Sequence, residues 1–184
     1  MINSDSTLTD VAFAVCTALD EAGIKAILTG GSAATYYAPD AYQSSDLDFV
    51  ITFHSGADGA AVLTALGYRS DSGAYVHRES PLPIEFPPGP LMIGDDYITR
   101  WATVERGNGE RLHVLSPTDS CRDRLAALLF WNDFSGLEQA LAVFRAQRSH
   151  IDLALIKDWC ARERRPEAYE IFAARLGDLG LPSG

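Results

Sequence analysis

Hydrophobic and polar positions recur with different periods along the chain, and each change of period predicts a boundary between elements. Residues 7–22 carry apolar side chains at helical spacing and are followed by Gly23, which predicts an amphipathic helix that stops there. The apolar run from Ile24 to Thr29 lies between two glycines and predicts a short buried strand. After the turn residues Gly30-Gly31-Ser32, the segment from Ala33 to Tyr37 fits one or two helical turns.

The middle of the chain has short apolar segments separated by turn residues. Strands are expected at Asp46 to Thr52, Gly73 to Arg78 and Leu82 to Phe86, with an alanine-rich helix at Ala57 to Leu66. The segments Ile98 to Glu105 and Arg111 to Leu115 flank Gly107-Asn108-Gly109, which is a strong hairpin signal.

From Pro117 onward the pattern is helical throughout. Helices are expected at 119–131, 136–147, 151–162 and 166–176, with short polar joins. The chain is therefore expected to be α+β: a small mixed sheet flanked by helices at 1–115, followed by a helical part at 116–184. Because the join at Ser116-Pro117 has no flexible linker, the two parts are expected to pack together.

Composition places the chain among globular proteins. Of its 184 residues 47% are hydrophobic and 22% charged, which is enough apolar material for a core. No apolar run reaches the roughly 18 residues of a membrane-spanning helix, and the start Met1 to Asp5 lacks the features of a signal peptide. A cytoplasmic location without membrane contact is therefore expected. The cysteines and histidines are dispersed and show no zinc-site spacing.

The formal net charge is −10, from 25 acidic and 15 basic residues. An acidic surface repels phosphate backbones, so non-specific nucleic-acid binding is not expected. A nucleotide can still bind where metal ions screen the charge. The partner that accepts a transferred group is then expected to be a protein or a small molecule, and the acidic surface would also suit a basic protein partner.

Asp46-Leu47-Asp48 is the first candidate for chemistry. Residues two apart in a strand point to the same face, so both carboxylates would lie together. Two such charges repel each other unless a cation lies between them, and Mg²⁺ prefers carboxylate, water and phosphate oxygens. The alternative is that both acids are solvated where a strand begins.

Two further features support the same chemistry. Gly30-Gly31-Ser32 follows an expected strand and precedes an expected helix, so its backbone could approach a phosphate, and Ser32 could bind a phosphate oxygen or cap the helix. The alternative is an ordinary turn. Glu85 interrupts an apolar strand and needs a partner or a cation, unless it faces water from an edge strand. Together these groups have the layout of two-metal phosphoryl or nucleotidyl transfer.

The order Gly-Ser, loop, Asp-x-Asp and later acidic strand resembles the polymerase β-type nucleotidyltransferase superfamily, including bacterial minimal nucleotidyltransferases and abortive-infection toxins. Thirteen residues, 33–45, separate Gly31-Ser32 from Asp46. The resemblance implies that Asp46 and Asp48 bind Mg²⁺, with two ions expected, and the triphosphate. It implies that Glu85, where the family more often has aspartate, completes the metal site or activates the acceptor hydroxyl. Ser32 and the amides of the glycine turn would hold the β- and γ-phosphates.

The helical part supplies the remaining candidates. Arg124 is the expected contact to the triphosphate, with a surface ion pair to Asp123 as the alternative. Trp131 is expected in the core rather than under an adenine, and Tyr36 and Tyr37 on a packed helix face. The resulting function is Mg²⁺-dependent transfer of a nucleoside monophosphate from a nucleoside triphosphate, expected to be ATP, to a hydroxyl acceptor. The alternative is an inactive nucleotide-binding module or a toxin–antitoxin partner of the same fold.

Overall fold

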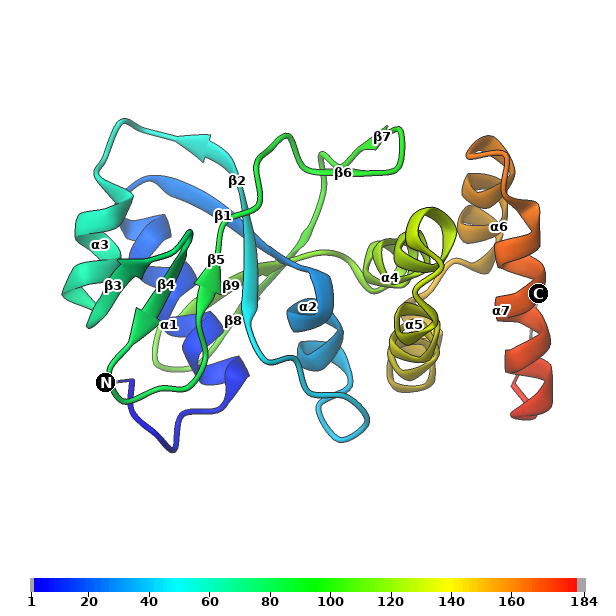
Figure 1. Ribbon diagram of the computed structural model, residues 1–184, viewed down its shortest axis with the longest axis horizontal. Coiled ribbons are helices and arrows are strands. Elements are labelled where there is room, and N and C mark those ends of the chain that lie inside the picture. Colours follow the sequence, from blue (N-terminus) through cyan, green and yellow to red (C-terminus); the bar gives the residue numbers. More distant parts are fainter. Residues whose placement is uncertain (1, 182–184) are drawn as a thin grey trace.

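One mixed sheet of seven strands organises the first part of the chain in the computed structural model, which describes residues 2–181 (Figure 1). The strands follow the order β3-β4-β5-β2-β1-β9-β8. Their bounds are β1 Ile24–Thr29, β2 Leu47–His54, β3 Tyr68–Asp71, β4 Ala74–His77, β5 Ile84–Glu85, β8 Ala102–Glu105 and β9 Arg111–Val114. The central strand β1 pairs antiparallel with β2 and parallel with β9, which confirms the expected mixed sheet.

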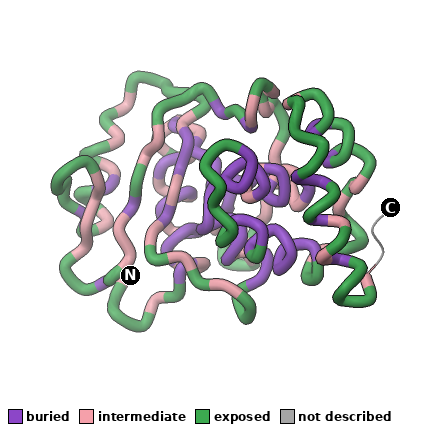
Figure 2. Tube along the Cα trace, turned by 45° about the vertical axis from the view of Figure 1, so that its right-hand side comes forward, coloured by how far each residue is buried: buried purple, intermediate pink, exposed green. Residues whose placement is uncertain are grey.

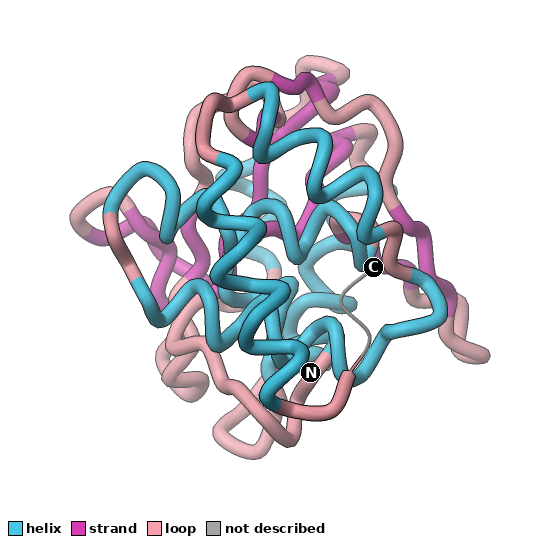
Figure 3. Tube along the Cα trace, turned by 90° about the vertical axis from the view of Figure 1, so that its right-hand side faces the viewer, coloured by secondary structure: helices cyan, strands magenta, loops and turns pink. Residues whose placement is uncertain are grey.

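Helices cover this sheet and then form a separate layer beside it (Figures 1 and 3). Their bounds are α1 Leu8–Glu21, α2 Gly30–Tyr37, α3 Gly59–Ala65, α4 Pro117–Trp131, α5 Phe134–Gln147, α6 Leu153–Arg162 and α7 Pro166–Asp178, with the 3-10 turn Arg148–His150 before α6. The expected α+β architecture is confirmed. Among residues 2–181, none of the helices is both long enough and apolar enough to span a membrane.

Local sequence signals explain where the main helices begin. At α1, Thr7 and Asp10 form a reciprocal capping box, in which each side chain accepts a hydrogen bond from the other residue's backbone N–H. At α4, the Ser116 side chain accepts the N–H of Asp119 at 3.1 Å, and Pro117 occupies the first turn, where its missing N–H leaves no hydrogen bond unmade.

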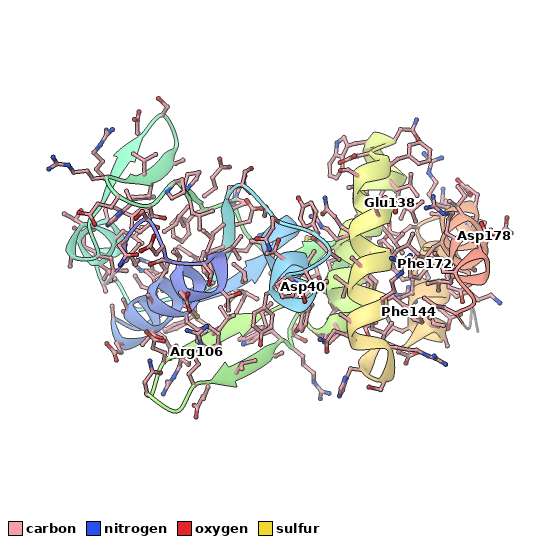
Figure 4. All side chains as sticks on the ribbon, turned by 90° about the horizontal axis from the view of Figure 1, so that it is seen from below. Asp40, Arg106, Glu138, Phe144, Phe172 and Asp178 are labelled. Atoms are coloured by element: carbon pink, nitrogen blue, oxygen red, sulfur yellow. The ribbon has the colours of Figure 1, made fainter. Side chains whose placement is uncertain are left out.

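Helix α2 joins the sheet to the helical layer. It follows β1 directly and contacts both α4 and α5 (Figure 1). One continuous core of buried side chains runs from the sheet through α2 into the late helices, as the buried tube in Figure 2 shows. Further out, Phe144 of α5 meets Phe172 of α7 edge to face, with ring centroids 6.0 Å apart (Figure 4). The division of the chain at residue 115 stays a prediction, because α2 belongs to the first part but packs against the second.

Two elements are absent from the expectations drawn from hydrophobic patterning. Strand β3 exposes three of its four residues, so it shows no apolar alternation. The second is the hairpin of β6 (Met92–Ile93) and β7 (Asp96–Tyr97), whose strands have only two residues each. Strand β3 pairs with β4, which follows it, and packs Tyr68 in the core, whereas β6 contacts α4, which is distant in the sequence.

Candidate functional site

The sheet places Asp48 beside Glu85. Strands β2 and β5 are parallel, with Leu47 opposite Ile84 and Asp48 opposite Glu85. Paired residues on neighbouring strands point to the same face, so the two carboxylates share one face of the sheet. On the other side of β2, Asp48 lies opposite Thr29, the last residue of β1. Asp48 therefore lies where the glycine turn begins.

Asp46 lies just outside β2, which begins one residue later than expected, at Leu47. Its Oδ1 accepts a hydrogen bond from Ser44 Oγ at 2.9 Å. Burial, together with the negative charges of Asp46, Glu85 and Asp123, raises the pKa of Asp48 to about 6, and the positive charge of Arg124 opposes this rise. The acids expected to act together are thus close enough to influence one carboxyl group.

The glycine turn touches Asp48 directly. Gly30 has a φ of +63°, and a Cβ there would overlap Asp48 Oδ2. At Gly31, a Cβ would lie 2.9 Å from Ser44 Oγ and 3.0 Å from the Tyr42 hydroxyl. Glycine at both positions lets the first turn of α2 approach Asp48 and the loop before it.

Ser32 has a different place from the one expected. Its side chain is fully buried, its Oγ donates to the Thr29 carbonyl at 2.7 Å, and it accepts the backbone N–H of Asp48 at 3.1 Å. Thr29, rather than Ser32, occupies the N-cap position of α2. The Ser32 hydroxyl therefore connects the end of β1 to the backbone of Asp48 through two hydrogen bonds.

A cavity of about 750 Å³ opens in front of Asp48. Thr29, Gly30, Asp48 and Val50 line it from the sheet, and Asp123 and Arg124 line it from α4. Its far wall is the segment from Pro87 to Asp95, which includes the first strand of the hairpin β6–β7. Asp46, Gly31, Ser32 and Glu85 are not among its lining residues.

Arg124 lines this cavity. It also makes the ion pair with Asp123 that was the alternative to a contact with the triphosphate. Its Nε and Nη2 donate to Asp123 Oδ2 at 3.0 and 2.7 Å, and its Nη1 donates to Gln139 Oε1 at 3.2 Å. Its positive charge partly offsets the rise in the pKa of Asp48 that burial and the neighbouring acids cause. The guanidinium is therefore held in place between a carboxylate and an amide, within reach of the cavity.

The carboxylates fit a magnesium site by the chemistry of their ligand atoms. Among residues 2–181, however, no three His, Cys, Asp or Glu side chains are grouped closely enough to hold a metal ion. Neighbouring strands lie about 4.8 Å apart, so rotation of the side chains of Asp48 and Glu85 would bring both onto one ion. Asp46 would have to leave its bond with Ser44.

Comparison with solved structures connects this geometry to a known fold. The chain resembles an antigenic nucleotidyltransferase-like protein from Paracoccidioides brasiliensis with a TM-score of 0.55 and 16% identity, over 78% of each chain. It resembles ANT(2")-Ia in complex with adenylyl-2"-tobramycin with a TM-score of 0.51 and 14% identity, over 85% of this chain and 96% of that one. The chain has the nucleotidyltransferase fold. No family model and no curated protein sequence matches it.

On this nucleotidyltransferase fold, the last turn of α4 corrects one expectation. Trp131 is not in the core: 75% of its surface is exposed, and it lines the cavity together with Phe130. Leu125, Leu128 and Leu129 of the same helix are buried. The aromatic pair comes at the end of the helix, just before Asn132, which has a left-handed conformation. Phe130 and Trp131 are the exposed residues of a last turn whose other two residues are buried.

The two tyrosines after the glycine turn pack as expected. Tyr37 is buried and donates from its hydroxyl to the Leu115 carbonyl at 2.7 Å. Tyr36 contacts the rings of Phe13 and Tyr37, at centroid distances of 6.4 and 5.0 Å. Neither residue lines the cavity in front of Asp48.

Sequence reasoning missed the acids at the outer wall of the cavity. Glu163, at the end of α6, accepts hydrogen bonds at Oε1 from the backbone N–H of Asp95, at 2.8 Å, and from Trp159 Nε1, at 3.0 Å. Asp95 and Glu163 both line the cavity. They are 68 residues apart in sequence, so no local pattern could have indicated that they meet.

The contact between Gly30 and Asp48 gives a first prediction. Replacing Gly30 by alanine should displace the Asp48 carboxylate and force a side chain into the left-handed region, which destabilises the fold by roughly 1–3 kcal/mol. Urea unfolding measures the loss. Gly107→Ala is the matched control, because a Cβ at Gly107 meets nothing within 4 Å. An unchanged unfolding free energy for Gly30→Ala would contradict the close approach described here.

Proposed function

We propose that the protein transfers a nucleoside monophosphate from a magnesium-bound nucleoside triphosphate, with ATP as the expected donor, to a hydroxyl group of an acceptor. The observation that carries the proposal is the position of Asp48. Its carboxyl group has neighbouring acids, borders the glycine turn and faces the same cavity as Arg124. The nucleotidyltransferase fold of the chain supports the same reaction class.

Each residue of the candidate site has a proposed role that follows from its position. Asp46, Asp48 and Glu85 would hold the magnesium ions, which when bound supply charge stabilisation for the attacking and leaving oxygens. The backbone N–H groups at the start of α2, around Gly30 and Gly31, would donate hydrogen bonds to oxygens of the β- and γ-phosphates. Ser32 would act indirectly, by fixing the backbone of Asp48. Arg124 would add a positive charge beside the triphosphate.

The reaction forms one bond and breaks one. The acceptor oxygen attacks the α-phosphorus, the bond from that phosphorus to the oxygen bridging to the β-phosphorus breaks, and pyrophosphate leaves. The hydroxyl proton would pass to a carboxylate, and we assign this role to Glu85, which is exposed and pairs with Asp48 across the strands. Glu85 would then serve as the base if two other acids suffice to hold the metal.

The acceptor is expected to be a small molecule or a protein segment. The cavity of about 750 Å³ lies in the size range of small-molecule sites. Its acidic residues, Asp48, Asp95, Asp123 and Glu163, disfavour a polyanionic acceptor such as a nucleic acid. Since the solved structure of ANT(2")-Ia contains adenylyl-2"-tobramycin, tobramycin belongs in the first set of acceptors to be tested.

Incubation with α-³²P-labelled ATP tests the proposal. With Mg²⁺ and a panel containing tobramycin, other hydroxyl-rich small molecules and serine- or tyrosine-containing peptides, we expect a labelled adduct and release of pyrophosphate. Both should disappear when EDTA removes the metal. Formation of ADP and transfer of the γ-phosphate instead would contradict nucleotidyl transfer.

A nucleotide-binding module without turnover is the second candidate. The observation that favours it is that Arg124 already bonds to Asp123 and Gln139, so it would have to give up these bonds to reach a phosphate. This candidate predicts that calorimetry detects MgATP binding while no acceptor becomes labelled. A labelled adduct with any acceptor would rule it out.

A further inference from the structure

Two neighbouring aromatic side chains project into the outer end of the cavity. Phe130 is 42% exposed and Trp131 is 75% exposed, and their rings meet edge to face with centroids 5.9 Å apart. Single exposed aromatic residues are common on protein surfaces. Here both aromatic residues line the same cavity as Asp48. Their exposure in that cavity favours a role in binding a ligand.

Helix α4 connects this aromatic end with the charged end. Asp123 and Phe130, like Arg124 and Trp131, are seven residues apart, which is two turns or about 10.5 Å along the helix. Residues at this spacing lie on one face of a helix. Between them, Ala126 and Ala127 also line the cavity and, as small residues, leave space above the helix.

The opposite wall of the cavity is also apolar at this end. Met92 of β6 is 36% exposed and lines the cavity, together with Pro88 and Pro90. Thioether and proline side chains pack well against flat rings. The outer end of the cavity therefore has apolar groups from both walls, beside the acids Asp95 and Glu163, while the inner end has Asp48, Asp123 and Arg124.

A ligand that matches both ends carries phosphates at one end and a flat ring at the other. We propose that Phe130 and Trp131 form the surface on which the base of the nucleoside triphosphate stacks, with Met92 facing it. This inference rests on the proposed function, because it assumes that the phosphates lie beside Asp48. Stacking uses the face of a ring, which every base has, so the aromatic pair alone does not select adenine over other bases.

Calorimetry with two ligands in the presence of Mg²⁺ tests the inference. ATP carries the base, and inorganic tripolyphosphate carries the phosphates alone. We expect Trp131→Ala to weaken ATP binding roughly tenfold and to leave tripolyphosphate binding unchanged. Trp131→Phe, which keeps a ring, should retain most of the affinity for ATP. Phe134→Ala is the matched control, because Phe134 is 61% exposed, lies just after this turn and does not line the cavity.

The outcomes separate this inference from the function on which it rests. If wild-type protein binds both ligands and Trp131→Ala leaves both affinities unchanged, or lowers both equally while the variant stays folded, base stacking is overturned and the phosphate site stands. An aromatic pair that serves a ring of the acceptor instead would give this result. If wild-type protein binds neither ligand, the proposed function fails and the inference fails with it.

Discussion

Replacing Asp48 by asparagine should abolish nucleotidyl transfer and, in the absence of metal, make the protein more stable at about pH 8. Activity should be lost because, in the proposed mechanism, the carboxylate nearest the glycine turn is a ligand of Mg²⁺. Stability rises because burial and the neighbouring acids Asp46 and Glu85 raise the pKa of Asp48 to about 6, from an ordinary value of 3.8. The ionised carboxylate therefore destabilises the folded state, and asparagine carries no charge.

The pH dependence follows from the direction of this shift. Because the pKa is higher in the folded than in the unfolded state, the folded protein binds the extra proton between about pH 4 and pH 6, and stability falls as the pH rises through that window. At about 1.4 kcal/mol for each pKa unit, and allowing for partial solvent exposure, the gain for Asp48→Asn above pH 6 is roughly 1–2 kcal/mol. Below about pH 4 the gain should vanish.

Denaturant unfolding in EDTA, at several pH values, measures the stability, and the labelled-ATP assay measures transfer. Asp71→Asn is the control for removing an acid, because the Asp71 side chain is 46% exposed and lies on the edge strand β3. It should change neither quantity. Addition of Mg²⁺ should stabilise wild-type protein more than Asp48→Asn. Full activity in Asp48→Asn, or a loss of stability above pH 6, would contradict the assignment of this carboxyl group.

Replacing Arg122 by methionine should lower the free energy of unfolding by roughly 2–4 kcal/mol. The Arg122 side chain is only 5% exposed. Its Nη1 donates to Asp119 Oδ1 at 2.9 Å, its Nη2 bonds to Asp96 of the hairpin β6–β7, and its guanidinium lies 5.0 Å from the centre of the Trp159 ring. Methionine fills much of the volume but leaves both carboxylates without their buried partner.

Arg162→Met provides a matched comparison, because Arg162 bonds to the same Asp96 Oδ2 at 2.7 Å from a side chain that is 56% exposed. Exposed ion pairs contribute little, so its loss should be under about 1 kcal/mol. Urea unfolding of both variants measures the difference. Equal losses for the two arginines would contradict the view that burial makes Arg122 the main anchor of the hairpin.

Local pattern was sufficient to predict much of the fold. The helix of residues 8–21 and the strand of residues 24–29 have apolar positions at a clear period and end at glycines, so the expected and observed bounds nearly coincide. The hairpin around Gly107-Asn108-Gly109 has turn residues at its centre, and β8 and β9 pair on either side of it. In the same way, the sequence predicted that Asp48 follows a glycine turn on a neighbouring strand, and the structure brings Asp48 and Gly30 into contact.

The remaining features depend on contacts between distant segments. The position of Ser32 was not predictable, because its burial results from the close approach of β1 and β2. Trp131 continues the apolar spacing of α4, so the sequence alone does not show that the buried positions of this helix end at Leu129. The outer wall of the cavity forms only when Asp95, in a loop with little periodicity, meets Glu163 of the last part of the chain.

A crystal structure with Mg²⁺ and a nonhydrolysable ATP analogue is the decisive test of the proposed site. We expect metal ions bound by Asp46 and Asp48, the β- and γ-phosphates against the backbone at Gly30 and Gly31, and the α-phosphorus open to the cavity. A nucleotide bound at another surface, or a metal ion that leaves Asp46 and Asp48 uncoordinated, would contradict this expectation.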